Sequence, residues 1–207
     1  LGEAEKDSFY CVGYSVVNYY LNDYIITSLL GHRGTKVGVE VLATFLPHMV
    51  VDSLYSVIER TGLEVTHLTL EPIAALNLAI PQELRLLNLA LVDVGAGTSD
   101  IAITKSGAVT AYAMVPLAGD ELTEAVAHNF LVDFNTAEHI KIALSNADEP
   151  VTFTDILDNT VTVSPEEIDN CLQPVIEQLA GTIAGKILEY NGGKAPNAVF
   201  LVGGGSQ

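Results

Sequence analysis

Residues 93–100 read Asp93-Val94-Gly95-Ala96-Gly97-Thr98-Ser99-Asp100, and they lie between two apolar runs. Residues 86–92 and 101–104 are short and rich in Leu, Val, Ile or Ala, which is typical of buried strands. The pattern therefore predicts a tight hairpin turn. Two glycines let backbone amides approach an anion closely, and a carboxylate at a strand end can hold a hydrated Mg²⁺. An ordinary Asp/Gly turn is the alternative for this segment taken alone.

Composition narrows the class of protein. The chain has 207 residues, of which 49% are hydrophobic, and no apolar run approaches the roughly 18–20 residues needed to span a bilayer. Its 9 basic and 26 acidic residues give a formal net charge of −17, so we expect no nucleic-acid partner. Cys11 and Cys171 lie far apart without metal-ligand spacing, which fits a reducing compartment rather than a disulfide framework.

The first seventy residues predict a small α+β unit. Strands are expected at 9–20, 36–45 and 63–70, and in the second of these the alternation of valines is typical of a half-buried strand. A helix is expected to begin at Pro47 and to end at Gly62, with one apolar stripe. The stripe consists of Val50, Val51, Leu54, Val57 and Ile58.

The remaining residues predict alternating strands and helices. A helix at 71–79, a strand at 108–115 and a helix with Asp120 as its N-cap come first. A helix at 136–144 and two short strand-like runs follow. Ser164-Pro165-Glu166-Glu167 then predicts the start of a long helix that ends near Gly192-Gly193, and residues 198–202 predict a buried strand.

Three separated segments together indicate a nucleotide site. The hairpin at 93–100 suits phosphate and Mg²⁺, and Gly203-Gly204-Gly205-Ser206 follows a strand where backbone can approach a flat ligand. Glu138 and Lys141 lie one helical turn apart, so they can reach a ribose hydroxyl and a ring edge. Taken singly, the glycine run is equally well a flexible turn, and the Glu-Lys pair is equally well a surface ion pair.

In their order and spacing these segments resemble the actin-like ATPase superfamily. Residues 93–100 resemble its second phosphate motif, 117–124 the entry to a helix of the second lobe, 137–141 the ribose-contacting helix, and 201–206 the adenosine motif. The resemblance implies ATP and Mg²⁺ as cofactors and an α/β, ribonuclease H-like lobe with a mixed five-stranded-type sheet flanked by helices. It implies that Asp93 holds Mg²⁺ and acts in catalysis, and that these residues contact the nucleotide: Gly95, Ala96, Gly97, Thr98, Ser99, Gly119, Asp120, Glu138, Lys141, Gly203, Gly204, Gly205 and Ser206.

Within the superfamily, residues 1–70 resemble the inserted subdomain (SHS2 type) of the FtsA family and of the related PilM family. The resemblance implies an inserted α+β subdomain at 1–70 and a second lobe at 71–207. In that lobe, 71–134 and 197–207 would form a sheet subdomain, and 135–196 a mostly helical one.

The FtsA resemblance implies a function in bacterial cell division. We expect an ATP-binding, self-associating adaptor that tethers an FtsZ-like cytoskeletal filament to the membrane, in the cytoplasm at the inner face of the cell membrane. Contact with the membrane would use segments outside these 207 residues. The alternatives are a PilM-like protein of pilus assembly and a chaperone-type actin-fold ATPase.

Glu71 stands where chaperone-type relatives carry a carboxylate that positions the attacking water, so it is the second candidate catalytic residue. Its alternative role is to complement the positive end of its own helix. The family's first phosphate hairpin and the C-terminal amphipathic anchor of FtsA are not found in the sequence. We therefore expect a piece of a longer protein that binds nucleotide weakly, and slow ATP hydrolysis at most.

Overall fold

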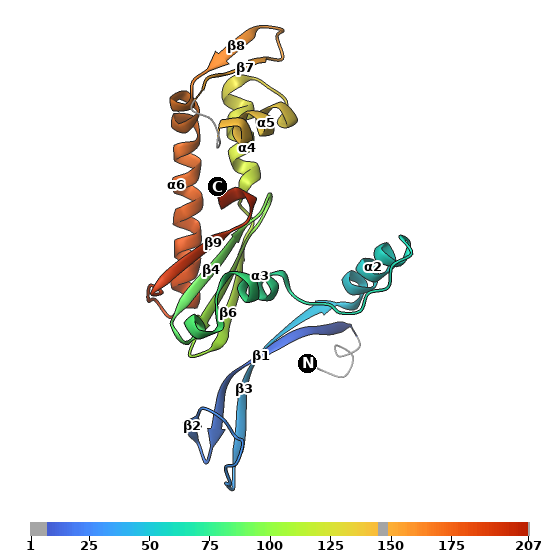
Figure 1. The fold of residues 1–207 in the computed structure, drawn as a ribbon, viewed down its shortest axis with the longest axis vertical. Coiled ribbons are helices and arrows are strands. Elements are labelled where there is room, and N and C mark those ends of the chain that lie inside the picture. The colour runs from blue at the N-terminus through green and yellow to red at the C-terminus, as the bar shows by residue number, and fades with distance from the viewer. Residues whose placement is uncertain (1–7, 145–148, 207) are drawn as a thin grey trace. The chain divides into compact units, whose positions relative to one another are not determined.

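The structure is a computed structural model that describes residues 8–144 and 149–206 (Figure 1). The chain divides into two compact units. Unit 1 comprises 1–89 and 102–111, and unit 2 comprises 90–101 and 112–207. The finer subdomain limits that the sequence suggests, at residues 70, 134 and 196, stay a prediction.

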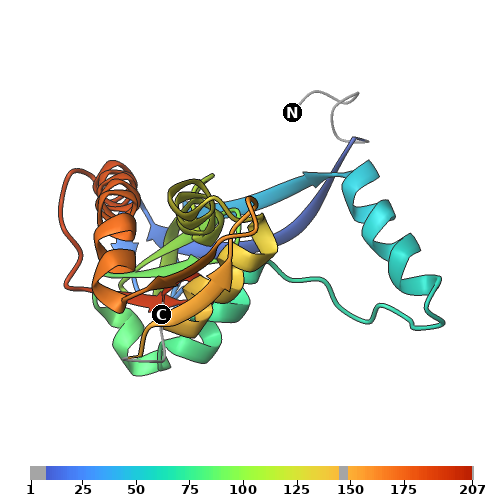
Figure 2. The ribbon, with the colours of Figure 1, turned by 90° about the horizontal axis from the view of Figure 1, so that it is seen from above.

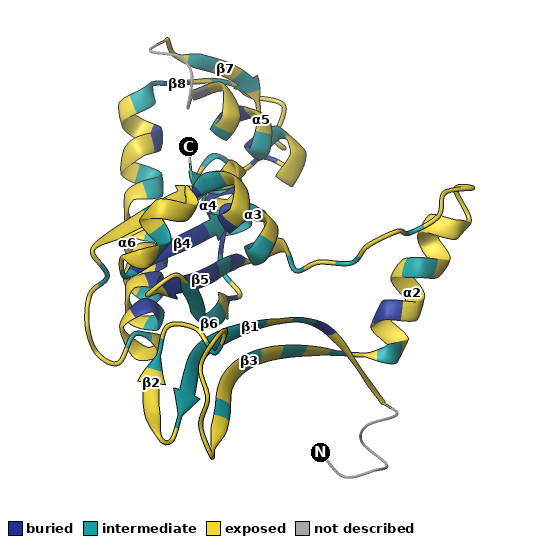
Figure 3. Ribbon diagram, turned by 60° about the horizontal axis from the view of Figure 1, so that its bottom comes forward, coloured by how far each residue is buried: buried dark blue, intermediate teal, exposed yellow. Residues whose placement is uncertain are grey.

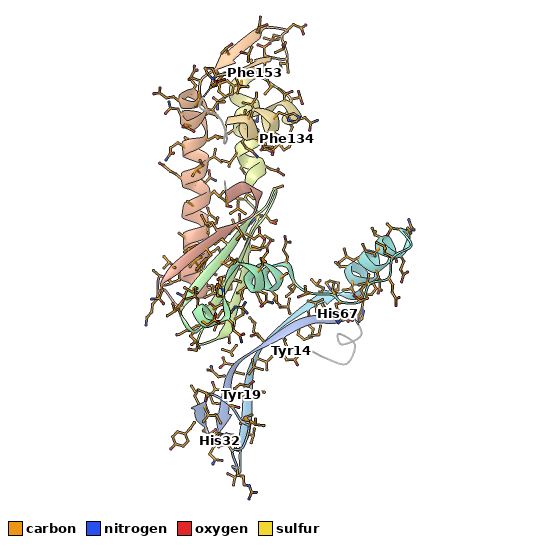
Figure 4. All side chains as sticks on the ribbon, viewed as in Figure 1. Tyr14, Tyr19, His32, His67, Phe134 and Phe153 are labelled. Carbon is orange, nitrogen blue, oxygen red and sulfur yellow. The ribbon has the colours of Figure 1, made fainter. Side chains whose placement is uncertain are left out.

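Unit 1 begins with a three-stranded antiparallel sheet in the order β2-β1-β3. Its strands are β1 (Phe9–Leu21), β2 (Tyr24–Ile26) and β3 (Val37–Pro47), so the two long strands are confirmed. Asn22 and Asp23 form the turn between β1 and β2 with φ of 50° and 68°, a left-handed conformation that Asn and Asp tolerate. Figure 4 labels Tyr14 and Tyr19 on β1.

Helix α2 (His48–Glu59) follows β3 directly, as predicted, but its apolar stripe is mostly uncovered. Only Val51 is buried, whereas Leu54 is 50% and Val57 62% exposed. The expectation of a half-buried face on β3 also fails, because Val37 and Val39 are 61% and 53% exposed. In Figure 3, helix α2 is mostly yellow, for exposed residues, and has one dark blue band, for the buried residue.

The strand predicted at residues 63–70 is wrong. These residues have no regular secondary structure, and most of them are exposed. Alternating apolar residues favour an extended backbone, but a strand also needs a neighbouring strand with which its amides and carbonyls can pair.

Helix α3 (Glu71–Ala79) has the predicted bounds and leads through the 3₁₀ helix η1 (Gln82–Leu86) toward the second sheet. The Arg85 side chain forms hydrogen bonds with acceptors at the C-terminal end of α3. Its guanidinium donates to the carbonyl of Ile80 from Nε at 3.0 Å and from Nη2 at 2.9 Å, and to Oδ1 of Asn77 at 2.8 Å. These bonds satisfy acceptors at a helix end that lack intrahelical partners.

The second sheet has the order β6-β5-β4-β9. Its strands are β4 (Leu89–Val94), β5 (Ser99–Lys105), β6 (Ala108–Val115) and β9 (Ala198–Val202). Most of the buried apolar residues of this sheet lie on its interior strands β4 and β5, whose ribbons are largely dark blue in Figure 3. Four strands therefore form this sheet in the described part of the chain. The expected fifth came from the family resemblance, since the sequence itself contains four strand-like runs here.

The prediction that residues 198–202 form a buried strand is half right. The strand exists, but it is an edge of the sheet, and Val199 and Leu201 are 46% and 59% exposed. A continuous apolar run is typical of a strand covered on both faces, yet it does not reveal whether covering elements are present.

Unit 2 also contains helices α4 (Gly119–Phe130), α5 (Phe134–Leu144) and α6 (Pro165–Tyr190), and a hairpin of β7 (Val151–Thr154) and β8 (Thr160–Val163), seen from a second direction in Figure 2. The Ser164 side chain caps α6 as predicted: its Oγ accepts from the amide of Glu167 at 3.3 Å. A cluster of buried residues joins these elements. It consists of Val126, Val132, Ala137, Ile140, Val163 and Ile168.

Candidate functional site

The segment 93–100 forms the predicted hairpin turn between β4 and β5. The amide of Gly95 donates to the carbonyl of Thr98 at 2.9 Å, which closes the turn. Ala96, Gly97 and Thr98 are exposed at its tip. The backbone groups at this tip are therefore open to a ligand, as an anion-binding turn requires.

The first turn of α4 docks onto this hairpin through backbone hydrogen bonds. The amide of Gly119 donates to the carbonyl of Gly95 at 3.0 Å, and the amide of Asp120 donates to the carbonyl of Ala96 at 2.8 Å. A Cβ atom at Gly119 would lie 3.1 Å from the Gly95 carbonyl oxygen, closer than most Cβ contacts. Glycine at 119 thus permits the close approach of helix and hairpin.

Asp120 is not the N-cap of α4, contrary to the prediction. The N-cap is Ala118, and Asp120 lies within the first turn beside Glu121. The Glu121 carboxylate accepts the amide of Ala118 at 2.6 Å. The hairpin carbonyls already satisfy the next two amides, so no capping side chain is needed at residue 118.

The second glycine segment packs against the end of β4. A Cβ atom at Gly203, whose φ is +89°, would lie 2.3 Å from the carbonyl oxygen of Val94 and 2.4 Å from Oδ1 of Asp93. A Cβ at Gly205 would lie 2.7 Å from the Val94 side chain. By contrast, a Cβ at Gly204 would meet no atom within 4 Å. The structure thus brings the two glycine segments together, and it leaves one glycine of the run facing open space.

Glu138 and Lys141 on α5 form an ion pair of 2.6 Å, with side chains 36% and 17% exposed. Lys141 Nζ also donates to Oγ1 of Thr123 at 2.7 Å and to the carbonyl of Gly119 at 3.1 Å. Burial opposes ionisation of Glu138, but hydrogen bonds from Lys141 and Thr123 outweigh it and hold the pKa of this carboxyl below its usual value. The pair is therefore tied to α4, unlike a solvated surface pair.

Among the predicted phosphate contacts, Ser99 occupies a different position from its neighbours. Its side chain is completely buried, and its hydroxyl donates to the carbonyl of Leu117 at 2.7 Å. That bond fixes the segment leading into α4. We therefore assign the Ser99 hydroxyl to the framework of the site rather than to a ligand.

Asp93 and Asp100 are partly buried on either side of the hairpin. Burial raises the pKa of the Asp100 carboxyl, a hydrogen bond from Thr98 lowers it, and repulsion from Asp93 raises it further. Two carboxylates that repel one another favour a nearby cation. In the described residues, no group of three or more His, Cys, Asp and Glu side chains could hold a metal ion. An ion here would thus take its remaining ligands from phosphate and water, as Mg²⁺ commonly does.

Glu71 is exposed in the first turn of α3, within unit 1. This position suits the interaction of a carboxylate with a helix N-terminus. Its role in positioning a water molecule stays a prediction.

Sequence reasoning missed Thr123, Glu121 and Asp100 as contributors to the site. The signal for Asp100 was its place at the end of the acidic segment, and the signal for Thr123 was a polar residue on an otherwise apolar helix face.

Among the described residues, no helix is both long enough and apolar enough to cross a bilayer.

Comparison with known proteins gives consistent matches. The family model described as cell division protein FtsA matches residues 90–206. Cell division protein FtsA of Bacillus subtilis (strain 168) is 26% identical over 163 residues, which cover 75% of this chain and 37% of that protein. The chain spans about a third of the length of the curated relatives it matches.

Two solved structures are similar in fold. A chain of the PilM-PilN type IV pilus biogenesis complex is 19% identical with a TM-score of 0.70, over 99% of this chain and 53% of that one. MreB5 of Spiroplasma citri bound to AMPPNP is 22% identical with a TM-score of 0.58, over 78% of this chain and 54% of that one. The expected actin-like α/β fold is thereby confirmed.

Proposed function

Because the chain belongs to the FtsA family of actin-fold cell division proteins, we propose that it acts as an ATP-binding, polymerising adaptor. In this proposal it links an FtsZ-like filament to the inner face of the cell membrane, and segments outside these 207 residues make the membrane contact. Its nucleotide state biases lobe closure and hence filament contacts.

The observation that carries the proposal is the meeting of the two glycine segments. Gly203 and Gly205 are held against the end of β4, and a Cβ at Gly205 would also lie 3.0 Å from the Gly95 carbonyl oxygen, while Gly204 faces open space. This arrangement supports assigning the phosphates to the amides of Ala96, Gly97 and Thr98, with the Gly95 amide closing the turn, and the adenosine to residues 203–206. The amides of Gly119 and Asp120 hold the hairpin in place by hydrogen bonds to its carbonyls.

The metal and ribose contacts follow from the carboxylates. Asp93 would hold a hydrated Mg²⁺, which neutralises phosphate charge when bound, with Asp100 adding to the negative potential. Glu138 would accept a ribose hydroxyl. Hydrolysis would be slow, with Glu71 orienting water, since phosphoryl transfer depends mainly on positioning and charge stabilisation.

A pair of glycine variants tests nucleotide binding. Gly204→Val adds a side chain where the protein leaves open space, so we expect an intact fold and at least tenfold weaker MgATP binding. Gly185→Ala in α6, where an added Cβ also meets no atom within 4 Å, is the control and should bind as the wild type does. Unchanged binding by Gly204→Val would contradict the adenosine assignment.

Co-sedimentation tests the adaptor role. We expect the natural full-length protein to pellet with FtsZ-like filaments, and the amount to depend on ATP. No association with or without ATP would contradict the proposal.

A PilM-like role is the second candidate, and its fold-level neighbour extends over residues 1–70 as well. In that role a short peptide from a membrane partner binds the inserted subdomain. The exposed apolar side chains of α2 and β3 support a protein-binding surface in unit 1. Saturable binding of such a peptide, lost in Leu54→Asp, would favour this role over the FtsZ-like partner.

A further inference from the structure

A buried threonine lies at the centre of the contacts between α4 and α5. Thr123 has no exposed surface, and its Oγ1 contacts Lys141 Nζ at 2.7 Å, the Gly119 carbonyl at 3.2 Å and Oε2 of Glu138. An ammonium group only donates and a carboxylate only accepts, so the directions of these bonds are fixed. Lys141 donates to Thr123, and the single proton of Thr123 is directed at two acceptors, the Glu138 carboxylate and the Gly119 carbonyl.

The ammonium of Lys141 connects α5 to the first turn of α4. It has three N–H donors, and it has three acceptors: Oε2 of Glu138 at 2.6 Å, Oγ1 of Thr123 at 2.7 Å and the Gly119 carbonyl at 3.1 Å. Lys141 therefore links the Glu138 carboxylate and Thr123 to Gly119.

Gly119 connects this network to the phosphate hairpin. Lys141 holds its carbonyl, and its amide donates to the Gly95 carbonyl at 3.0 Å. The network uses Oε2 of Glu138, and the side chain is still 36% exposed, so the carboxylate can also accept a bond from a ligand. A continuous set of hydrogen bonds therefore runs from the ribose carboxylate to the phosphate hairpin.

We propose that Thr123 is a positioning residue that contacts no ligand. Through its bonds to Glu138 and Lys141, it holds the Glu138 carboxylate and the first turn of α4 in one fixed arrangement, so that the ribose and phosphate contacts form together. This inference rests on the proposed nucleotide site and assigns to Thr123 a role that the sequence pattern did not.

The test compares Thr123→Val, Thr123→Ser and a matched control, Thr182→Val. Thr182 on α6 also bonds the carbonyl four residues earlier, Gln178 O at 2.8 Å, but outside the site. We expect MgATP binding to weaken roughly tenfold in Thr123→Val, by the usual worth of a hydrogen bond to a charged group. Thr123→Ser keeps the hydroxyl and should stay within about twofold of wild type, as should the control.

The ratio of the affinities for ATP and for 2′,3′-dideoxy-ATP distinguishes a positioning role of Thr123 from a loss of stability. The wild type should prefer ATP to 2′,3′-dideoxy-ATP roughly tenfold, because Glu138 bonds the ribose hydroxyls. Thr123→Val should reduce this preference toward one, and Thr123→Ser should preserve it. Partial unfolding would lower both affinities equally and leave the ratio unchanged. A wild-type ratio in Thr123→Val would overturn the positioning role.

Amide hydrogen exchange measured without nucleotide tests the role of Thr123 independently of the proposed nucleotide binding. If the wild type binds no MgATP, the proposed function fails, and the network is judged by exchange alone. Thr123→Val should then speed exchange at the amides of Gly119 and Asp120 roughly tenfold relative to Thr182→Val. Equal exchange in the two variants would show that Thr123 does not hold this turn, and would overturn the inference.

Discussion

The strands β4 and β3 carry similar apolar residues but have opposite environments. In β4 the side chains of Leu89, Leu91 and Val92 are at most 2% exposed, whereas in β3 those of Val37 and Val39 are more than half exposed. Both segments form strands, as their sequences predict. The difference teaches that an apolar pattern determines backbone conformation, while burial depends on which other elements cover the strand.

The largest effect should come from truncating a covered strand. Ile101 on β5 is completely buried, so Ile101→Ala should lower the free energy of unfolding by about 4 kcal/mol. Val39→Ala on the exposed face of β3, where the side chain is 53% exposed, should cost less than about 1 kcal/mol. Denaturant unfolding measures both. Equal costs would mean that the face of β3 is covered in solution.

The second largest effect is a difference in stability between alanine substitutions at the neighbouring residues Gly203 and Gly204. Gly203→Ala places a Cβ 2.3 Å from the Val94 carbonyl oxygen at a φ of +89°, so it should destabilise the protein by about 3 kcal/mol. Gly204→Ala meets open space and should change stability by less than about 0.5 kcal/mol. Thermal or denaturant unfolding of the two variants checks this. A tolerated Gly203→Ala would contradict the packing of this turn on β4.

The third effect concerns polar contacts in unit 1, where fewer apolar side chains are buried. Arg85→Met keeps the aliphatic stem but removes the bonds to Ile80 and Asn77, so it should cost about 1–2 kcal/mol. Arg60→Met at the exposed end of α2 is the control and should change little. If both variants unfold alike, the end of α3 does not depend on the guanidinium.

The smallest effect is a pH dependence at Glu138. Its pKa in the folded state is lowered, so its charged form stabilises the fold fully above the unfolded-state pKa of about 4.3. That contribution is lost as the pH falls through the lower folded-state pKa. The side chain is 36% exposed, and screening keeps the contribution below about 1 kcal/mol.

Unfolding of wild type and Glu138→Gln at pH 7 and pH 3 measures this contribution. The difference in stability between the two proteins should shrink at pH 3. Glu189→Gln, at an ion pair whose carboxylate is 59% exposed, serves as the control with little effect at either pH. A difference for Glu138→Gln that stays constant with pH would show that its charge does not matter to the fold.

Local signals predicted most of the secondary structure because they act within a few residues. The capping box at Ser164 and the Pro in the first turn of α3 gave helix starts that the structure confirms. Asp120 failed as an N-cap because its helix end is satisfied by the carbonyls of a hairpin about 24 residues earlier, a tertiary contact that no local rule contains. Residues 63–70 failed for the related reason that strand pairing is not local.

The site was predictable as a set of segments but not as a set of contacts. The glycines at 95 and 97 and at 203–205 stood out by composition, and the structure places the two segments together. The reason for Gly203 and Gly205 differs from the expected one, since β4 rather than a flat ligand excludes their Cβ atoms. Thr123 was missed because its importance comes from three partners on two helices, which spacing in one helix does not reveal.

The central claim is that two distant glycine turns bind one nucleotide, and amide chemical shifts during an MgATP titration test it most directly. We expect the amides of Gly95–Thr98 and of Gly203–Ser206 to shift together along one saturation curve. The amides of Gly192 and Gly193, which follow the end of α6 and have positive φ, are the internal control and should stay unchanged. Shifts confined to one of the two segments, or two separate saturation curves, would contradict the account.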